Sequence, residues 1–546
     1  MDAVEIYKKA LAQFKAKNYD ATLRILDEVK IAAPHWKKPL LLEAYILREQ
    51  GKTVELFLFA QKILPLFNAA LPEEKFLLSD VLNLLGIACS KLGMAQSAVE
   101  LSRFAGETSK DNAEICSELS NAILAANAVE NFSADDFKKL YNEYKKYLSD
   151  IAPYPRKFYA HKKIRVGFLS ADFRIHPVIK WAWTLLTALN KNSFDTYCYS
   201  AGKVFDIVTK HISATVDKWR DISTLNDVEA AKLIRGDEID ILFDLSGHTG
   251  SNRLRVAAYR PASVQISGVG YMNSTGLDCF DYFLSDEICA AGSEEFFTEK
   301  LIRLPHSHIC YESSTSLEIS SPPCLKKNFV TFASFNQLSK VTDSMLTAWK
   351  KILDAVPQSR LILKNKTFNT DDGKNFFVNR LKFIGLDVSR VEMRGFTGDY
   401  LRQYDDVDIA LDTFPYTGGV TTCEALYMGV PVVSLYGNRH GSRFGLSILK
   451  NIGLEELAVA TYDDYVERAI ALAGDWELLT ILRKNLRGMM KNSPLMDSEN
   501  YIREVEAAFK KILREDFYEQ RRDKNCVRKS QGAPRLFYSR DLRGGH

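Results

Sequence analysis

The sequence contains a loop whose residue types can hold a phosphate or a diphosphate. In the run L-D-T-F-P-Y-T-G-G-V-T-T (residues 411–422), a predicted strand ends in an aspartate, and a Pro- and Gly-containing loop leads into a helix that we expect to begin near Val420. Glycines let a ligand approach the backbone closely, and the start of a helix offers unpaired N–H groups and a positive dipole end. The small residues and hydroxyl donors of this loop are Gly418, Gly419, Thr421 and Thr422. An ordinary capped turn of an α/β fold is the alternative interpretation.

A second stretch places an amide and a lysine after another predicted strand. In S-F-N-Q-L-S-K (residues 334–340), Gln337 and Lys340 follow the first strand of what we expect to be a second α/β domain. The lysine can neutralise an anionic oxygen, and the amide can donate or accept a hydrogen bond. Because ligands of open α/β sheets bind beside the carboxyl ends of the strands, this loop is placed to meet a ligand in a cleft between the domains. A lone lysine on a loop is otherwise simply solvated.

A third stretch carries a histidine after the first strand of the preceding domain. In S-A-D-F-R-I-H-P (residues 170–177), His176 stands before a proline, which biases its backbone to an extended form. Histidine titrates near neutrality and can act as a general base or hydrogen-bond a reacting hydroxyl. Asp172 can orient His176 or cap the next segment. Most single histidines are not catalytic, so His176 is a candidate only in combination with the other motifs.

Three further stretches carry weaker signals. The loop G-V-G-Y-M-N-S-T-G (residues 268–276), which contains Tyr271, can admit a sugar or a peptide backbone, or it is a plain tight connection. The D-V-D run at 406–408 has the form that binds a metal–nucleotide in one class of sugar transferases. It leads directly into a predicted strand, so we expect a solvated lead-in instead. The run at 437–441 lacks the G-K-[ST] end of a Walker loop.

Alternating strands and helices from residue 160 onward are expected to position these loops. We predict strands over residues 164–170, 239–245, 264–269, 282–285, 329–335, 360–364, 391–394, 409–412 and 432–435. Helical patterns lie between most of them, as at 341–356, 372–386 and 420–429. This alternation is typical of parallel sheets covered by helices, and the span is too long for one sheet. We therefore expect an α/β fold of two Rossmann-like, doubly wound domains, 160–322 and 326–513, whose facing strand ends form a ligand cleft.

Residues 1–150 are expected to form an all-α domain of degenerate tetratricopeptide-like repeats. Glycine and proline are sparse there, and apolar residues recur at helical spacing. Lys17 and Gly51 occupy matching turn positions 34 residues apart, which is the tetratricopeptide period. The next such turn, at Gly93, follows after 42 residues, so this unit is irregular. A helical domain without repeat geometry is the alternative.

The composition is that of a globular protein. Of 546 residues, 46% are hydrophobic and 26% are charged, which excludes a largely disordered chain. The 72 basic and 69 acidic residues give a formal charge of +3, so there is no global electrostatic case for nucleic-acid binding. The nine cysteines form no C-x-x-C pair, and we expect free thiols rather than a zinc site or a disulfide framework.

The ends of the sequence and its apolar runs bear on location. The first residues lack the layout of a signal peptide. No apolar run approaches the roughly 20 residues that span a bilayer. We therefore expect no membrane span and a cytoplasmic location. Residues 514–546 form a basic tail without clear periodicity, which we expect to be solvated.

Together, and in this order, the motifs resemble the O-GlcNAc transferase family and its bacterial relatives, glycosyltransferase family 41. The resemblance covers roughly residues 160–512, behind a helical-repeat region in the expected place. The motifs that carry it are D-F-x-x-H-P (172–177), R-P-A-x-x-Q (260–265), G-Y (270–271), F-N-Q-x-x-K (335–340) and L-D-T…G-G-x-T-T (411–422). The resemblance implies the GT-B fold, a UDP-sugar donor in the interdomain cleft, and catalysis without a metal or another cofactor.

The resemblance also implies roles for single residues. Lys340 and the helix start would stabilise the departing diphosphate in place of a divalent cation, and Glu424 would hold the donor ribose. His176 would lie near the anomeric carbon as a base or an acceptor-orienting group. Asp172 and Tyr271 would belong to the loops around the sugar and the acceptor. The residues implied for the UDP-sugar are Gln337, Gly418, Gly419, Thr421, Thr422 and Glu424.

The sequence departs from the family pattern at several positions, and these leave the donor sugar and the acceptor open. Lys180 stands where relatives often carry a histidine, and His248 stands where a tyrosine is common. The function we expect is inverting transfer of a sugar, first GlcNAc, from a UDP-sugar to Ser or Thr of proteins held by the repeats and the cleft. The alternatives are transfer of glucose to Asn, a non-catalytic tetratricopeptide scaffold, and a sugar-nucleotide epimerase of the same architecture.

Overall fold

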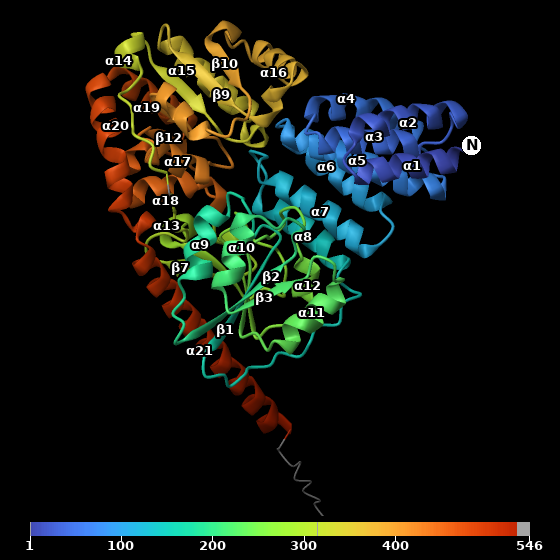
Figure 1. Cartoon of the computed structure of the whole chain (residues 1–546). Helices are drawn as coiled ribbons and strands as arrows, with labels where there is room; N and C mark the ends of the chain where they lie inside the picture. Colours follow the sequence, from blue (N-terminus) through green and yellow to red (C-terminus); the bar gives the residue numbers. More distant parts are fainter. Residues whose placement is uncertain (1, 314, 532–546) are drawn as a thin grey trace, which may run out of the picture.

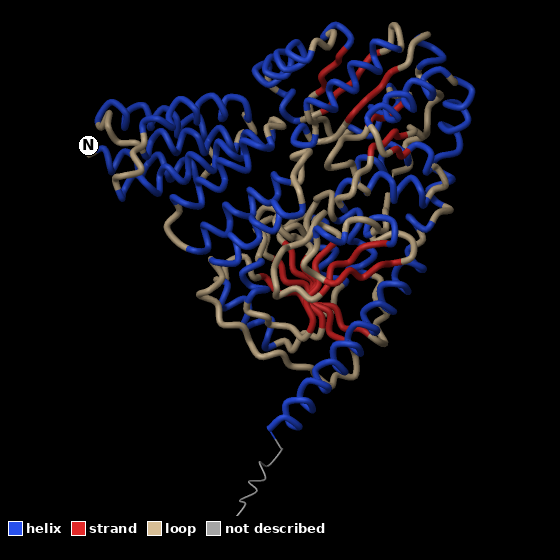
Figure 2. The backbone as a smooth tube through the Cα atoms, turned by 180° about the vertical axis from the view of Figure 1, so that it is seen from behind, coloured by secondary structure: helices blue, strands red, loops and turns tan. Residues whose placement is uncertain are grey.

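Three parts follow one another along the chain in the computed structural model, which describes residues 2–313 and 315–531 (Figure 1). Paired helices form the first part, and a parallel sheet with helices on its faces forms the centre of each of the other two. Figure 2 shows the two sheets as separate groups of strands, with the paired helices to one side of both. Among the described residues, no helix is long and apolar enough to cross a membrane.

The first part consists of four antiparallel helix pairs. The pairs are α1 (Ala3–Lys15) with α2 (Tyr19–Ala32), α3 (Lys38–Glu49) with α4 (Thr53–Ile63), α5 (Pro72–Lys91) with α6 (Ala95–Thr108), and α7 (Asn112–Ala126) with α8 (Ala134–Lys146). The turn residues Lys17, Gly51 and Gly93 have φ of +59°, +72° and +81°, so each predicted repeat turn closes its pair with a left-handed residue. The irregular spacing before Gly93 arises because α5 has 20 residues and a short 3₁₀ turn precedes it.

The second part contains a seven-stranded parallel sheet with the order β3-β2-β1-β4-β5-β6-β7. Its strands are β1 (Ile164–Ser170), β2 (Phe194–Ser200), β3 (Lys218–Asp221), β4 (Ile241–Asp244), β5 (Val264–Gly268), β6 (Tyr282–Asp286) and β7 (Lys300–Leu304). Its helices include α9 (Ile179–Thr187), α10 (Ile207–Thr215), α11 (Asp227–Gly236) and α12 (Leu254–Ala258). The sequence analysis found β1, β4, β5 and β6, whose residues are largely buried, and missed β2, β3 and β7.

The third part contains a six-stranded parallel sheet with the order β10-β9-β8-β11-β12-β13. Its strands are β8 (Thr331–Ser334), β9 (Arg360–Lys364), β10 (Val391–Arg394), β11 (Ile409–Leu411), β12 (Val432–Leu435) and β13 (Ala458–Val459). Its helices include α15 (Asp343–Ala355), α16 (Asp371–Ile384), α17 (Val420–Tyr427), α18 (Phe444–Asn451), α19 (Tyr462–Gly474) and α20 (Trp476–Lys491). The expectation of a solvated strand lead-in before β11 is wrong for Asp408. That side chain is 2% exposed and accepts hydrogen bonds from the backbone N–H groups of Cys324 and Thr331.

The last helix corrects the prediction of a basic tail without periodicity from residue 514. Helix α21 (Ser498–Gln531) runs past the second part and continues through Gln531 (Figure 1). Phe509 packs against Phe194 and Phe243 of the seven-stranded sheet, and Tyr282 donates a hydrogen bond of 2.9 Å to Asp516. The helix therefore follows the six-stranded sheet domain in the chain but packs against the seven-stranded one. Residues 532–546 of the predicted tail lie outside the described residues.

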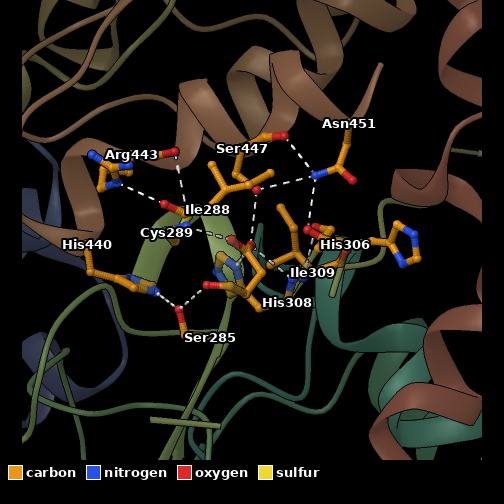
Figure 3. A network of polar contacts seen from close by, with 12 residues as sticks. Ser285, Ile288, Cys289, His306, His308, Ile309, His440, Arg443, Ser447 and Asn451 are labelled. Atoms are coloured by element: carbon orange, nitrogen blue, oxygen red, sulfur yellow. Dashed lines mark hydrogen bonds and ion pairs between the residues drawn. The ribbon is translucent and has the colours of Figure 1, made fainter. Parts of the chain in front are cut away.

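Buried polar contacts join the two sheet domains at a seam next to α18 (Figure 3). Ser285, in β6, shares a hydrogen bond of 2.8 Å with Nε2 of His440 in the third part of the chain. Its neighbour Asp286 is fully buried and lies 2.5 Å from Nδ1 of His308, and Ser447 of α18 donates to the same carboxylate (3.0 Å). Burial favours the neutral acid, but the charge of His308 and its hydrogen bond outweigh this effect and lower the pKa of Asp286 to about 2.

The helical part is anchored to both sheet domains. Ser120 of α7 bonds to Nδ1 of the fully buried His248 (3.0 Å), and Asn127 donates to the Tyr271 hydroxyl (3.3 Å). Burial lowers the pKa of His248 to about 4, so this histidine is a neutral packing residue. From the third part, Arg439 donates to backbone carbonyls at the end of α7 and in the turn after it. The helices are thus fixed relative to the cleft between the sheets.

Candidate active site at the junction of the two sheet domains

The loops that follow β8 and β11 meet because these strands are neighbours in the six-stranded sheet. Asp412, directly after β11, is buried and shapes the second loop. Its Oδ1 accepts hydrogen bonds from the N–H groups of Thr413 (2.8 Å) and Gly418 (2.6 Å), and its Oδ2 accepts one from Ser434 (2.8 Å). The carboxylate therefore folds the loop back so that α17 begins beside the strand ends. This is the structural reason for an aspartate at the end of the predicted strand.

Lys340 lies at this junction in a short 3₁₀ turn, Leu338–Lys340. Its Nζ donates to the carbonyl oxygen of Thr417 (2.9 Å) and lies 3.6 Å from the centre of the Tyr416 ring. Burial lowers the pKa of the ammonium to about 8, and the nearby Asp412 carboxylate opposes this effect. Residues with a strongly shifted pKa are common in functional sites. Lys340 combines such a shift with a position next to a loop and the start of a helix.

The start of α17 is organised by hydrogen bonds before any ligand arrives. Thr421 donates to the side-chain oxygen of Asn336 (2.8 Å), and Asn336 donates to Asp412 (3.2 Å). These residues, with Thr422 and Ser334, line a small hollow beside β8 and β11. The Ser334 hydroxyl is buried there and has no hydrogen-bond partner among the described residues. The hollow has room for about one water molecule, and its hydroxyl and amide groups organise the start of α17.

The two glycines of the loop are required by contacts within the protein. A Cβ atom on Gly418 would lie 2.5 Å from Thr422 Oγ1 and 2.8 Å from Asp412 Oδ1. A Cβ atom on Gly419 would lie 2.1 Å from the indole ring of Trp181, which belongs to α9 of the other sheet domain. The close approach that the glycines permit is therefore between the two domains as well as within the loop.

Glu424 of α17 faces the other sheet domain. Its side chain is 4% exposed, and its Oε1 is bound by the ammonium of Lys180 and the hydroxyl of Tyr400. Lys180 lies in the first turn of α9, and Nζ is also 3.3 Å from the Tyr400 hydroxyl. The interaction with Glu424 raises the pKa of Tyr400 in addition to the larger effect of burial. The acid implied for the donor ribose is thus paired across the cleft.

His176 and Asp172 lie in the loop between β1 and α9. The N–H of Val178 donates to His176 Nδ1 (3.4 Å), and the imidazole side chain is 35% exposed. Burial is the largest effect on His176 and lowers its pKa, so the ring is neutral at pH 7. Asp172 is 3.8 Å from the ring but forms its closer contact, 2.8 Å, with Arg174. Because Nδ1 accepts the hydrogen bond from Val178, the proton of the neutral ring lies on Nε2, which has no hydrogen-bond partner in the described part of the chain and can donate to a ligand. Asp172 is shared between two partners.

Of the predicted site residues, only Thr421 and Thr422 line the hollow. Tyr271 is 2% exposed, and its hydroxyl is bonded to the helical part through Asn127. Gln337 is exposed, and its Oε1 accepts a hydrogen bond from Asn365 (3.4 Å). The sequence analysis gave no role to Asn336, Ser334, Tyr400 or Tyr404. A signal existed for Asn336, which stands inside the F-N-Q-x-x-K motif, whereas the others require the packed structure.

One group in the described part of the chain brings three ligands of the kinds that metals prefer close together. Atoms of Cys289, His308 and His440 lie within 4.8 Å of one another. Both ring nitrogens of His440 are engaged, by Ser285 (2.8 Å) and by the carbonyl of Met272 (3.1 Å). The group lies at the buried seam of Figure 3 and shares no residue with the hollow beside Lys340.

Comparison with known proteins decides the family. The profile of glycosyl transferase family 41 matches residues 145–318 and 321–505. The chain belongs to glycosyl transferase family 41. The predicted membership of the O-GlcNAc transferase family is thereby confirmed, as is the predicted fold of two Rossmann-like domains behind a helical domain.

Relatives of this family 41 protein are found among plants and bacteria. A solved structure of an O-GlcNAc transferase mutant from Thermobaculum terrenum superposes with a TM-score of 0.84 and 28% identity, over 94% of this chain and 98% of that one. The probable UDP-N-acetylglucosamine–peptide N-acetylglucosaminyltransferase SPINDLY of Solanum lycopersicum is 38% identical over 69% of this chain and 41% of its own length. The protein SEC of Arabidopsis thaliana, named for the same activity, is 27% identical over 64% of this chain and 37% of its own. The chain thus spans about two fifths of the length of these plant relatives.

Proposed function

We propose that this protein transfers a sugar from a UDP-sugar to side chains of proteins, with inversion at the anomeric carbon and without a metal ion. The observation that carries the proposal is the convergence of the Lys340 ammonium, the start of α17 and the Thr421–Asn336–Asp412 network at the domain junction. A cation and helix N–H groups are suited to an anionic leaving group. The names of the relatives in the same family support a UDP-sugar donor and a peptide acceptor.

The reaction requires one displacement. An acceptor hydroxyl attacks the anomeric carbon, the bond from that carbon to the β-phosphate oxygen breaks, and UDP leaves with the bonding electron pair. Lys340, the N–H groups at the start of α17 and the threonine hydroxyls hold the charge that develops on the leaving diphosphate. His176 accepts the hydroxyl proton at Nε2 when its ring proton lies on Nδ1, which gives up the contact with the Val178 N–H. In the tautomer that keeps this contact, the Nε2–H group orients the acceptor instead.

The names of the relatives support a first candidate for the donor and the acceptor. GlcNAc is the first candidate sugar and Ser or Thr the first acceptor, because the relatives are named as peptide N-acetylglucosaminyltransferases. A groove on the helical part, lined by residues that include Phe57, Leu101 and Phe104, offers a partly apolar surface for a protein acceptor. Transfer of glucose to Asn is the second candidate, because Lys340 and the start of α17 would bind the diphosphate, which is common to UDP-GlcNAc and UDP-glucose.

A scaffold without activity is the competing function. A scaffold has no need for a buried lysine such as Lys340, whose pKa is lowered by burial. It also has no need for a buried hydroxyl without a hydrogen-bond partner among the described residues, such as that of Ser334. The test is incubation of the full chain with single UDP-sugars and candidate acceptor proteins in the presence of EDTA, followed by intact mass measurement. An increment of one N-acetylhexosamine supports the first candidate, and one hexose supports the second. No increment with any donor, metal or acceptor favours the scaffold.

A further inference from the structure

Lys180 crosses from one sheet domain to a residue of the proposed donor site. It lies in the first turn of α9, and its ammonium binds Oε1 of Glu424 in α17. The Glu424 side chain is 4% exposed and the Lys180 side chain 33%, so the pair lies at the edge of the cleft with the carboxylate inside. The two residues are 244 positions apart in sequence, and their contact exists only when the two domains are packed together.

The position of Lys180 is unfavourable for a purely structural lysine. A cation in the first turn of a helix opposes the helix dipole, and α9 has no acidic residue in that turn. The backbone is fixed, because the carbonyl of Lys180 accepts a hydrogen bond from the N–H of Glu312 (3.1 Å). The side chain is therefore held at the helix start and extends away from its own domain toward Glu424.

Both contacts to Glu424 go to the same oxygen. Lys180 and Tyr400 bind Oε1, and no group in the described part of the chain donates to Oε2. A carboxylate with one oxygen fixed and the other unused can accept a hydrogen bond from a ligand hydroxyl. The ribose of a nucleotide carries such hydroxyls.

The charges of the site also require a second cation. Asp412 and Glu424 are both nearly fully buried close to where a diphosphate would bind, and the ligand adds further negative charge. Lys340 interacts electrostatically with Asp412, and Lys180 pairs with Glu424. Without Lys180, the Glu424 carboxylate would repel the ligand at short range in a medium of low dielectric.

We propose that Lys180 is a positioning residue for the donor nucleotide: it fixes Glu424 through Oε1, so that Oε2 accepts a ribose hydroxyl, and it neutralises Glu424 next to the diphosphate. The inference rests on the proposed function, because it assumes that a ribonucleoside diphosphate occupies the cleft. It assigns a role to the lysine that stands where relatives carry a histidine.

The experiment is a calorimetric titration of UDP into the full chain, for the wild type and the variants K180M, K180R, E424Q and K180M/E424Q. We expect K180M to weaken UDP binding by about tenfold or more, as loss of one partner of a buried charge pair does, and K180R to recover most of it. In the E424Q background, K180M should change the affinity less than about threefold, because the charge that Lys180 neutralises is gone. In transfer assays, K180M should raise the donor KM more than it lowers kcat.

A matched control is K163M. Lys163 pairs with Asp195 (3.1 Å) at 35% exposure, close to that of Lys180, but outside the cleft, and the variant should bind UDP like the wild type. K180Q serves as a second variant if K180M does not fold. Two results would overturn the role of Lys180 but leave the proposed function standing. One is equal UDP affinity of K180M and the wild type, and the other is an undiminished effect of K180M in the E424Q background. A wild-type protein that binds no UDP would overturn the proposed function and this inference with it.

Discussion

Lys340 Nζ donates a hydrogen bond of 2.9 Å to the carbonyl oxygen of Thr417 and thereby ties the loop after β8 to the loop that leads into α17. An ammonium has three N–H donors, so this bond fixes the lysine and leaves capacity for ligand oxygens. The Tyr416 ring on one side and burial in the junction restrict the side chain further. The site thus holds its cation in place before substrate binds, as electrostatic catalysis requires.

Replacement of Lys340 should abolish most activity without unfolding the protein. We expect Lys340→Ala to lower kcat by about a hundredfold or more, the range for loss of a group that stabilises a developing charge. His176→Ala should lower it less, because general acid–base assistance is the smaller contribution when the leaving group carries most of the charge. Steady-state transfer kinetics on both purified variants check the order, and a larger loss in His176→Ala would refute it.

The pH dependence of donor binding should report the ammonium of Lys340. Its pKa is lowered to about 8 in the free protein, so the charged form is present below pH 8 and is lost as the pH rises above that value. UDP affinity should therefore fall between pH 7 and pH 9, by at most about tenfold per pH unit. The bound diphosphate favours the charged form, so the decline in kcat should occur at higher pH than that in kcat/KM. Titrations at constant ionic strength measure the profile, and an affinity unchanged from pH 7 to pH 9 would contradict it.

Gly419→Ala should disturb the contact between the two sheet domains at the site. The added Cβ would lie 2.1 Å from the Trp181 ring, so either α9 or the start of α17 must move. We expect UDP binding to weaken by about tenfold or more, since displacement of a positioned site of this kind is costly. Gly488→Ala, where a Cβ meets nothing within 4 Å, is the control and should bind normally.

A second substitution makes the Gly419 prediction specific. Trp181→Leu in the Gly419→Ala protein removes the ring that the new Cβ would strike, and part of the UDP affinity should return. If the single variant Gly419→Ala binds UDP like the wild type, then the close contact between α17 and α9 has no part in donor binding.

The His308 side chain, at the seam between the sheet domains, should contribute strongly to the stability of the protein. Its removal in His308→Ala leaves the fully buried Asp286 without its cationic partner, which typically costs about 3–5 kcal/mol. Ser285→Ala removes a neutral hydrogen bond to His440 and should cost only about 1 kcal/mol. Urea unfolding of the two variants measures the difference. Equal losses would show that the Asp286–His308 pair carries no special stabilisation.

The same pair predicts a loss of stability in acid. The pKa of Asp286 is lowered to about 2, below that of an aspartate in an unfolded chain, so its contribution is complete above about pH 4 and is lost as the pH falls toward 2. The difference in unfolding free energy between the wild type and an Asp286→Asn variant should therefore shrink over this range. A difference that stays constant between pH 5 and pH 3 would disagree with the lowered pKa.

Most central strands of both sheets and the edge strand β10 could be predicted from the sequence, whereas the edge strands β3, β7 and β13 and the interior strand β2 were missed. Strands such as β4 and β5 are buried on both faces and read as nearly continuous apolar runs. The edge strand β3 is K-W-R-D, half-exposed, and has no such run, and β13 has two residues. Helix α21 was not predicted beyond residue 513, and its contact with the seven-stranded sheet through Phe509 is one that no local pattern shows.

The candidate site could be predicted because its residues follow strand ends. Residues that reach the site only through the packing of the two domains could not be predicted in this way. Lys340 and Thr421 each follow a predicted strand, and neighbouring parallel strands bring their ends together. The pair Lys180–Glu424 joins different domains and depends on their packing. Tyr271, in a loop of small residues, is bonded to Asn127 of the helical part, a contact that the sequence pattern does not show.

Titration of UDP into the full chain in the presence of EDTA, for the wild type and Lys340→Met, tests the central claim most directly. If a lysine and a helix start replace a divalent ion, the wild type binds one UDP per chain without metal, and Lys340→Met, although folded, binds at least about tenfold more weakly. Binding that appears only when magnesium or manganese is added, or equal affinity of the two proteins, would contradict the account.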